Sequence, residues 1–135
     1  MSAYQTYKTQ FNRNHKDVLV QALKAVGLTA QSFDDPKSLF GYTGDERKTR
    51  AHVVVRRANI GSASNDLGWE YLADGTCVSH ISDYDSSRFS EQWQNNLAMK
   101  YSELFIRKIA EENGMSVGME VQADGTVQLQ LVNLY

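Results

Sequence analysis

The segment CVSHISDYD, residues 77–85, is where nucleophilic and metal-ligating side chains lie closest together in this sequence. A thiolate nucleophile needs a histidine within hydrogen-bond reach. The segment reads as a strand, and residues three apart on a strand lie on opposite faces, so Cys77 and His80 would not meet. The pattern therefore favours a buried, unreactive Cys77 over a catalytic thiol.

A metal site is the second chemistry that this segment could support. If the strand ends near residue 82, a loop could bring Asp83 and Asp85 back to His80, and three such ligands suffice for an open site. The other histidines, His15 and His52, are distant in sequence. Acidic residues before a helix are also typical of turns and of the helix dipole. We expect no metal and no cofactor, and keep a metal-dependent hydrolase as an alternative.

The run ERKTRAHVVVRR, residues 46–57, could contact phosphates, because it concentrates basic side chains beside a tyrosine able to stack on a base. Positive charges on an exposed strand also prevent edge-to-edge aggregation, which is the interpretation that we favour. An acidic protein partner is a third interpretation. The candidate binding residues are Tyr42, Arg47, Lys48, Arg50, Arg56 and Arg57.

The β-branched centre of this run predicts a strand over residues 50–57. Alternation puts Ala51, Val53 and Val55 on one buried face. The opposite face is expected to be solvated and carries Arg50, His52, Val54 and Arg56.

The remaining elements follow from periodicity and from helix stop signals. Apolar spacing predicts a short helix over residues 14–27 and a long one from about Ser90 to Asn113, with Ser90 as N-cap and Gly114 as stop. Leu97, Tyr101 and Leu104 should pack it on the sheet. Residues 34–49 hold the only proline and are expected to be irregular. Strands are expected over residues 4–11, 67–72, 76–82, 117–121 and 127–131.

The tetrapeptide ADGT occurs at residues 73–76 and again at 123–126. Each copy separates two predicted strands, and Asp-Gly in that context is a strong hairpin signal, because the favoured turn needs positive φ at its central residues. Asp74 and Asp124 are therefore assigned to turns rather than to a catalytic site.

Composition narrows the class of protein. With 135 residues, the chain has the size of one domain spanning residues 1–135. A net charge of −2 gives no global attraction to nucleic acid or to anionic membranes. The single cysteine excludes an internal disulfide, and no apolar run is long enough for a membrane span. We expect a cytoplasmic protein that does not bind membranes.

The element order predicts an α+β fold with a mainly antiparallel sheet, a short N-terminal helix and one long helix, both on one face. Over nearly its whole length the chain resembles the uncharacterised cyanobacterial and plastid family called hypothetical chloroplast open reading frame thirty-five, a domain of unknown function. That resemblance implies the same fold class and transfers no catalytic residue. It is carried by YKTQF, LVQALKAVGL, DLGWEY, MKYSELFIRKIAEENGMSV and DGTVQLQLVNLY.

The sequence contains no phosphate-binding glycine loop, nucleophile elbow or dinucleotide-binding fingerprint. We therefore expect a small non-enzymatic binding or accessory protein with an unknown protein partner. A nucleic-acid-binding domain that uses residues 47–57 is the first alternative.

Overall fold

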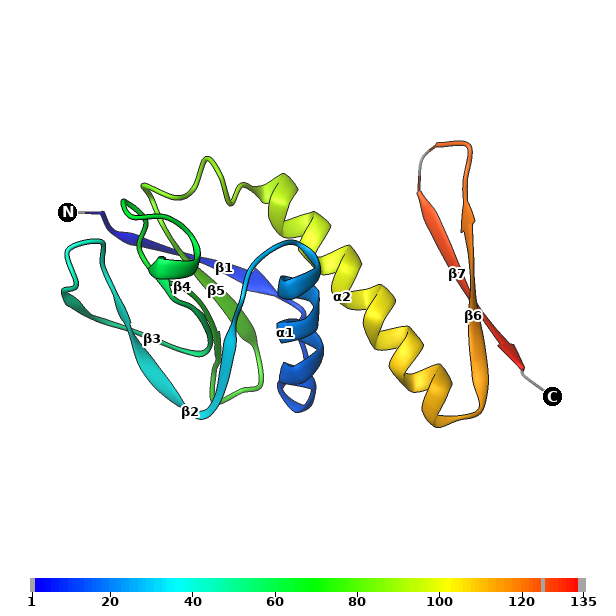
Figure 1. Cartoon of the computed structure of the whole chain (residues 1–135). Helices are drawn as coiled ribbons and strands as arrows, with labels where there is room; N and C mark the ends of the chain where they lie inside the picture. Colours follow the sequence, from blue (N-terminus) through cyan, green and yellow to red (C-terminus); the bar gives the residue numbers. More distant parts are fainter. Residues whose placement is uncertain (1, 125, 134–135) are drawn as a thin grey trace.

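The computed structural model describes residues 2–124 and 126–133. It confirms the α+β class: a five-stranded antiparallel sheet carries two helices, and a two-stranded hairpin follows (Figure 1). Two short 3-10 turns precede α1 and β4. The elements are β1 Tyr4–Thr9, α1 Lys16–Ala25, β2 Gln31–Phe40, β3 Glu46–Val55, β4 Leu67–Tyr71, β5 Cys77–Ser82, α2 Glu91–Glu112, β6 Met115–Val121 and β7 Val127–Asn133.

The five strands lie in the order β1-β5-β4-β3-β2, and all neighbours are antiparallel. Leu19 and Leu23 of α1 and Leu97 of α2 share one core cluster with Trp69 of β4. Both helices therefore cover the same face of the sheet, as the sequence predicted. β1 and β2 are the two edge strands.

The long helix forms where its capping signals indicated. The Ser90 side chain accepts a hydrogen bond from a backbone N–H of the first turn, and Gly114 follows the helix with φ +66°. Leu97 and Tyr101 are buried in the core, with Leu104 packed against it. The predicted N-cap, stop and core contacts are all confirmed.

The prediction that residues 34–49 are irregular is wrong for most of that range, because β2 and the start of β3 occupy it. The irregularity that the composition predicted lies instead in the β2–β3 pairing, whose register changes between Ser32 and Lys37 and between Ser38 and Phe40. Pro36 lies within the first of these. An edge strand tolerates proline, because its outer side has no ladder hydrogen bonds to lose.

The predicted faces of β3 are partly wrong. Val53 and Val55 pack in the helix-side core, as expected. Ala51, however, shares a second cluster with Val54 and with Leu39 of β2. The register shift between the pairs at Val53 and at Ala51 breaks the simple alternation. The second face is not solvated there, since Leu39 and Phe33 of β2 pack in the cluster that holds Ala51 and Val54, and residues 51–55 are all buried.

Asp74 and Gly75 lie in the turn between β4 and β5, and Asp124 lies in the turn between β6 and β7. The Asp74 and Asp124 carboxylates accept hydrogen bonds from the backbone nitrogens of Thr76 and Thr126 at 2.9 and 3.0 Å, and the hydrogen bonds from these threonines lower the pKa of both carboxyl groups. Gly75 has φ +88°, whereas Asp74 does not have positive φ. The first turn is thus a three-residue loop with glycine at its last position, not the two-residue turn expected. Gly125 lies outside the described residues.

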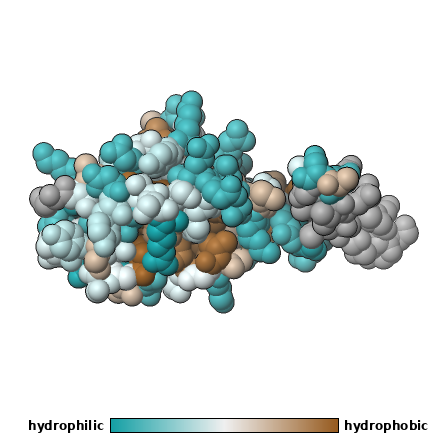
Figure 2. All heavy atoms as spheres, turned by 90° about the horizontal axis from the view of Figure 1, so that it is seen from above, coloured by the Kyte–Doolittle hydropathy of each residue, from teal (hydrophilic) through white to brown (hydrophobic). Residues whose placement is uncertain are grey.

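No helix among the described residues is long and apolar enough to cross a membrane. Seen from above the view of Figure 1, the main body shows mostly hydrophilic residues around a smaller hydrophobic area (Figure 2).

Candidate functional site

A groove of about 670 Å³ lies between the edge strand β1 and helix α2. Its walls are polar, with Lys8 and Glu91 as the only charged residues among those that line it. Its floor is apolar. The strand side consists of residues 6–11, the helix side of Glu91, Gln94, Asn95, Ala98 and Ser102, and the floor of Trp69, Leu97 and Tyr101.

The groove follows the edge of β1 rather than one of its faces. Side chains of a strand alternate between faces, so a cavity above one face would be lined by every second residue. Here Thr6 to Phe11 line the groove without interruption. The backbone of the strand is therefore itself part of the groove wall.

The pairing of β1 with β5 determines which backbone groups face the groove. The Asp83 nitrogen donates to the oxygen of its opposite residue, Ala3, at 2.8 Å, so this pair is hydrogen-bonded. In an antiparallel pair such positions alternate. Residues 5, 7 and 9 therefore bond β5, and the backbone groups of Tyr4, Thr6 and Lys8 point to the open edge. For Thr6 and Lys8, the described part of the chain provides no partner for these N–H and C=O groups.

The opposite wall is one stripe of α2. Positions 91, 94, 95, 98 and 102 recur at the three-to-four-residue spacing of one helix face. Ala98 at the middle of this stripe leaves room that a longer side chain would fill. The hydroxyl of Ser79 donates to Gln94 Oε1 at 3.1 Å and ties the helix to β5 below the groove.

The floor holds the two walls at a fixed spacing. Trp69 and Leu97 are buried, and the Tyr101 hydroxyl accepts a hydrogen bond from the Asn12 backbone nitrogen at 3.0 Å. Burial raises the pKa of Tyr101, so the phenol is neutral near neutral pH. The arrangement is a preformed slot with hydrogen-bonding groups along one side and apolar surface below.

The basic residues singled out in the sequence do not form one free surface. Arg47 stacks over the Tyr4 ring at 5.6 Å from its centroid, and its Nε lies 2.8 Å from Asp45 Oδ2. Arg57 Nη1 donates to the Ser62 carbonyl at 3.1 Å. These cations already have partners within the fold.

Arg56 is held by the buried carboxylate of Asp66. Asp66 Oδ2 accepts hydrogen bonds from Arg56 Nη1 and from the Phe40 nitrogen, both at 2.8 Å, and Asp66 Oδ1 accepts from the Arg57 nitrogen at 2.7 Å. The Tyr4 hydroxyl donates to the Asp66 carbonyl at 2.6 Å. Arg56 is therefore a structural residue that fixes the loop before β4 to β2 and β3.

Lys48 and Arg50 remain exposed on β3, without an ion-pair partner among the described residues. Tyr42 is 45% exposed in the turn between β2 and β3, and its nitrogen donates to Asn65 Oδ1. The segment of β3 that carries Lys48 and Arg50 pairs with β2 only, because β4 pairs with β3 from Val53 onwards. Two free cations make a much smaller basic patch than the sequence suggested.

The candidate metal ligands have separate partners. His80 Nδ1 and Nε2 lie 3.0 Å from Thr6 Oγ1 and 2.8 Å from Glu70 Oε1. Asp83 Oδ1 accepts from the Ala3 nitrogen, on the outer side of the turn.

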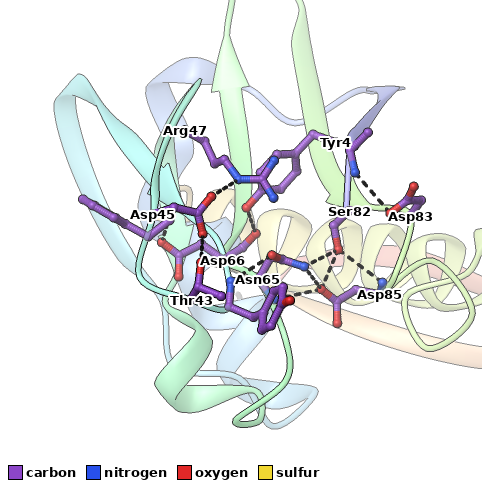
Figure 3. A network of polar contacts seen from close by, with 12 residues as sticks. Tyr4, Thr43, Asp45, Arg47, Asn65, Asp66, Ser82, Asp83 and Asp85 are labelled. Atoms are coloured by element: carbon purple, nitrogen blue, oxygen red, sulfur yellow. Dashed lines mark hydrogen bonds and ion pairs between the residues drawn. The ribbon is translucent and has the colours of Figure 1, made fainter. Parts of the chain in front are cut away.

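Asp85 is turned into a buried network, where its Oδ2 accepts from the Ser82 hydroxyl at 2.7 Å and from the Asn65 nitrogen at 3.1 Å (Figure 3). Across the described residues, no three His, Cys, Asp or Glu side chains are grouped so that they could hold a metal ion. The structure does not bring His80, Asp83 and Asp85 together as a ligand set.

Cys77 and His80 lie on opposite faces of β5, as predicted. Cys77 is buried in the helix-side core, and burial raises its pKa to about 11. His80 lies on the other face beside Glu70. A thiol with that pKa is protonated at neutral pH and is not a nucleophile.

Sequence reasoning missed both the groove and the buried network. Asn65 and Asp66, in the loop before β4, are among the most buried polar residues. The one available signal was a pair of Asx residues directly before a buried strand, which is also typical of ordinary turns. The groove stripe on α2 is polar and so looks like any solvated helix face.

Comparisons with known proteins add no relative: no family model, curated protein or solved structure matches the chain.

Proposed function

We propose that the chain is a non-enzymatic binding protein that takes up an extended segment of a partner protein in the groove between β1 and α2. The bound segment would add a strand to the sheet beside β1. The observation that carries this proposal is the open edge of β1, whose backbone lines the groove from Thr6 to Phe11.

Strand addition obtains affinity from main-chain hydrogen bonds and specificity from pockets for alternate side chains. The outward groups of Tyr4, Thr6 and Lys8 would supply the main-chain bonds. Every second side chain of the ligand would then lie over the apolar floor at Trp69 and Leu97. With one acidic and one basic residue in its walls, the groove favours a segment that is neutral and apolar at alternate positions.

Proline at Lys8 tests the main-chain contribution. The Lys8 N–H points to the open edge, so Lys8→Pro removes a donor to the ligand and no bond within the sheet. Lys8→Ala is the matched control, since it removes the side chain and keeps the N–H. The probes are peptides selected from a random peptide library displayed on phage, with the whole chain as bait. Their affinity is measured by fluorescence polarisation.

We expect Lys8→Pro to weaken binding at least tenfold and Lys8→Ala to change it little. Filling the groove with Ala98→Leu should also abolish binding, whereas Asn96→Leu, which adds the same side chain elsewhere on the exposed surface of α2, should not. Circular dichroism would confirm that each variant is folded. Failure to select any peptide, or equal binding by both Lys8 variants, would contradict the proposal.

A further inference from the structure

An open pocket of about 670 Å³ lies at the end of the sheet where β1 begins and β5 ends. Four segments of the chain line it: Ser2 before β1, Tyr42 between β2 and β3, Ala63 before β4, and Asp83 with Tyr84 after β5. The pocket shares no lining residue with the groove between β1 and α2. It is therefore a separate surface, and a ligand bound here does not depend on strand addition in the groove.

Two tyrosines and one carboxylate give this pocket its chemistry. Tyr42 and Tyr84 are 45% and 58% exposed, and they are two of the four large hydrophobic side chains that the described residues leave exposed. Asp83 is also exposed, and of the described residues that line the pocket it is the only charged one. The faces of aromatic rings attract cations, as does a carboxylate. The complementary ligand therefore carries a positive charge.

The buried polar network holds both tyrosine-bearing segments in place. The Tyr42 nitrogen donates a hydrogen bond to Asn65 Oδ1 at 3.0 Å. The Asn65 nitrogen donates in turn to Asp85 Oδ2 at 3.1 Å, and Asp85 directly follows Tyr84 (Figure 3). A ligand that binds such a preformed surface loses less free energy to the ordering of the protein.

Asp83 is fixed through one carboxylate oxygen and keeps the other available. The Asp83 nitrogen donates to the Ala3 carbonyl at 2.8 Å, and the Ala3 nitrogen donates to Asp83 Oδ1 at 3.2 Å. Asp83 Oδ2 has no hydrogen-bond partner among the described residues. This oxygen can accept hydrogen bonds from a cation in the pocket.

The fold already contains one contact of this kind within the chain. Arg47 stacks over the Tyr4 ring at 5.6 Å from its centroid, and its Nε lies 2.8 Å from Asp45 Oδ2. A guanidinium group suits this combination because it is planar, stacks on aromatic rings and presents several N–H donors to a carboxylate. A lysine ammonium group is a more strongly hydrated point charge and suits it less well.

We propose that the pocket formed by Tyr42, Asp83 and Tyr84 binds the side chain of an arginine on a partner protein. The guanidinium group stacks on the tyrosine rings and donates to Asp83 Oδ2. Pockets of this volume hold ligands much larger than a guanidinium group, so the residues beside the arginine also find room. The occupant is therefore arginine within a polypeptide rather than a free guanidinium compound.

NMR titration of the full chain tests the proposal. The probe is a short blocked peptide with one arginine between glycines, and its matched control has citrulline, which keeps the planar shape and lacks the charge. Because exposed cation–aromatic contacts and exposed ion pairs are each weak, we expect a Kd in the millimolar range. Saturable shifts should centre on Tyr42, Asp83 and Tyr84. The citrulline peptide should bind about tenfold more weakly or worse, and methylguanidine should also bind more weakly than the arginine peptide.

Two variants test the role of the named side chains. Asp83→Asn removes the charge and keeps an oxygen that can accept from the Ala3 nitrogen, and it should weaken binding of the arginine peptide severalfold. Asp34→Asn is the matched control, since it removes a fully exposed carboxylate elsewhere, and it should bind like the wild type. Tyr84→Leu removes an aromatic ring independently of Asp83 and should also weaken binding.

Three results would overturn the proposal. The first is equal affinity for the arginine and citrulline peptides, which would show that charge is not recognised. The second is a set of shifts that does not include Tyr42 and Tyr84, or the absence of saturable shifts. The third is methylguanidine that binds as tightly as the arginine peptide, which would make a free small molecule the occupant.

Discussion

His52 Nδ1 accepts a hydrogen bond from the backbone nitrogen of Tyr71 at 3.0 Å. The imidazole nitrogen takes the place of a backbone carbonyl of the neighbouring strand. β4 pairs with β3 only from Leu67 to Trp69, so the next N–H directed at β3, that of Tyr71, lies beyond the end of the backbone pairing. The buried imidazole supplies the missing acceptor. This bond requires an unprotonated Nδ1, because a doubly protonated ring has no acceptor.

His52 should therefore make stability depend on pH. Burial, followed by the positive charges of Lys16 and Arg13, lowers its pKa below the ordinary value of about 6.5. The unfolded chain then binds the proton more readily than the folded one, so stability falls as pH drops through about 6.5. The slope for one such group is at most about 1.4 kcal/mol per pH unit.

Urea unfolding at about pH 8 and about pH 5.5 measures this effect. The control is His52→Asn, whose amide oxygen can accept the same bond but does not titrate. Because His15 and His80 are present in both proteins, their contributions cancel in the comparison. We expect the wild type to lose more stability on acidification than the variant. Equal losses would show that His52 is not responsible.

Removing the buried carboxylate of Asp66, in the loop before β4, should be costly for stability. Asp66 is 1% exposed and accepts hydrogen bonds from two backbone nitrogens and from Arg56. Asp66→Ala leaves these donors without their acceptor, which should destabilise the fold by roughly 3 kcal/mol in denaturant unfolding. Asp34→Ala is the control, since the Asp34 side chain is fully exposed in its 3.4 Å pair with Lys16. That variant should behave like the wild type.

The features that depend on local signals could be predicted from the sequence. The features that depend on contacts between residues distant in sequence could not. The α2 boundaries follow from Ser90 and Gly114, and the hairpins follow from Asp-Gly, because capping and turn chemistry act over a few residues. The pairing of Arg56 could not be predicted in this way, since it depends on Asp66, ten residues further on, whose carboxylate is also held by the Phe40 backbone nitrogen. The groove is equally non-local. It requires knowing that β1 ends at the sheet edge and that α2 lies beside it.

Gly68 of β4 marks a position where side chains of β3 and β2 approach the backbone closely. A Cβ there would collide with the Ala51 methyl group and would lie 3.0 Å from Leu39 Cδ1, both within the second core cluster. Gly68→Ala should therefore destabilise the fold by about 1–3 kcal/mol, the usual cost of overpacking a core. Gly61→Ala is the matched change, because a Cβ at Gly61 meets only Ser64 Oγ, at an ordinary 3.6 Å. Equal unfolding midpoints for the two variants would contradict the close approach.

The open edge of β1 leads to a prediction that can be tested on the free chain, without a ligand. If Thr6 and Lys8 direct their N–H groups into the groove, amide hydrogen exchange should be fast at these two positions. It should be slow at Gln5 and Tyr7, whose N–H groups bond β5. Exchange of Thr6 and Lys8 should exceed that of their neighbours by an order of magnitude or more, because only the neighbours need the sheet to open.

Exchange followed by NMR on the free chain resolves these amides individually. On addition of a peptide selected from the displayed library, Thr6 and Lys8 should gain protection while Gln5 and Tyr7 change little. That pattern separates strand addition from binding over one face, because a ligand on the face would touch side chains without protecting alternate amides. Uniform protection along residues 5–8 in the free chain would mean that the edge is already covered. The groove could then not accept a strand.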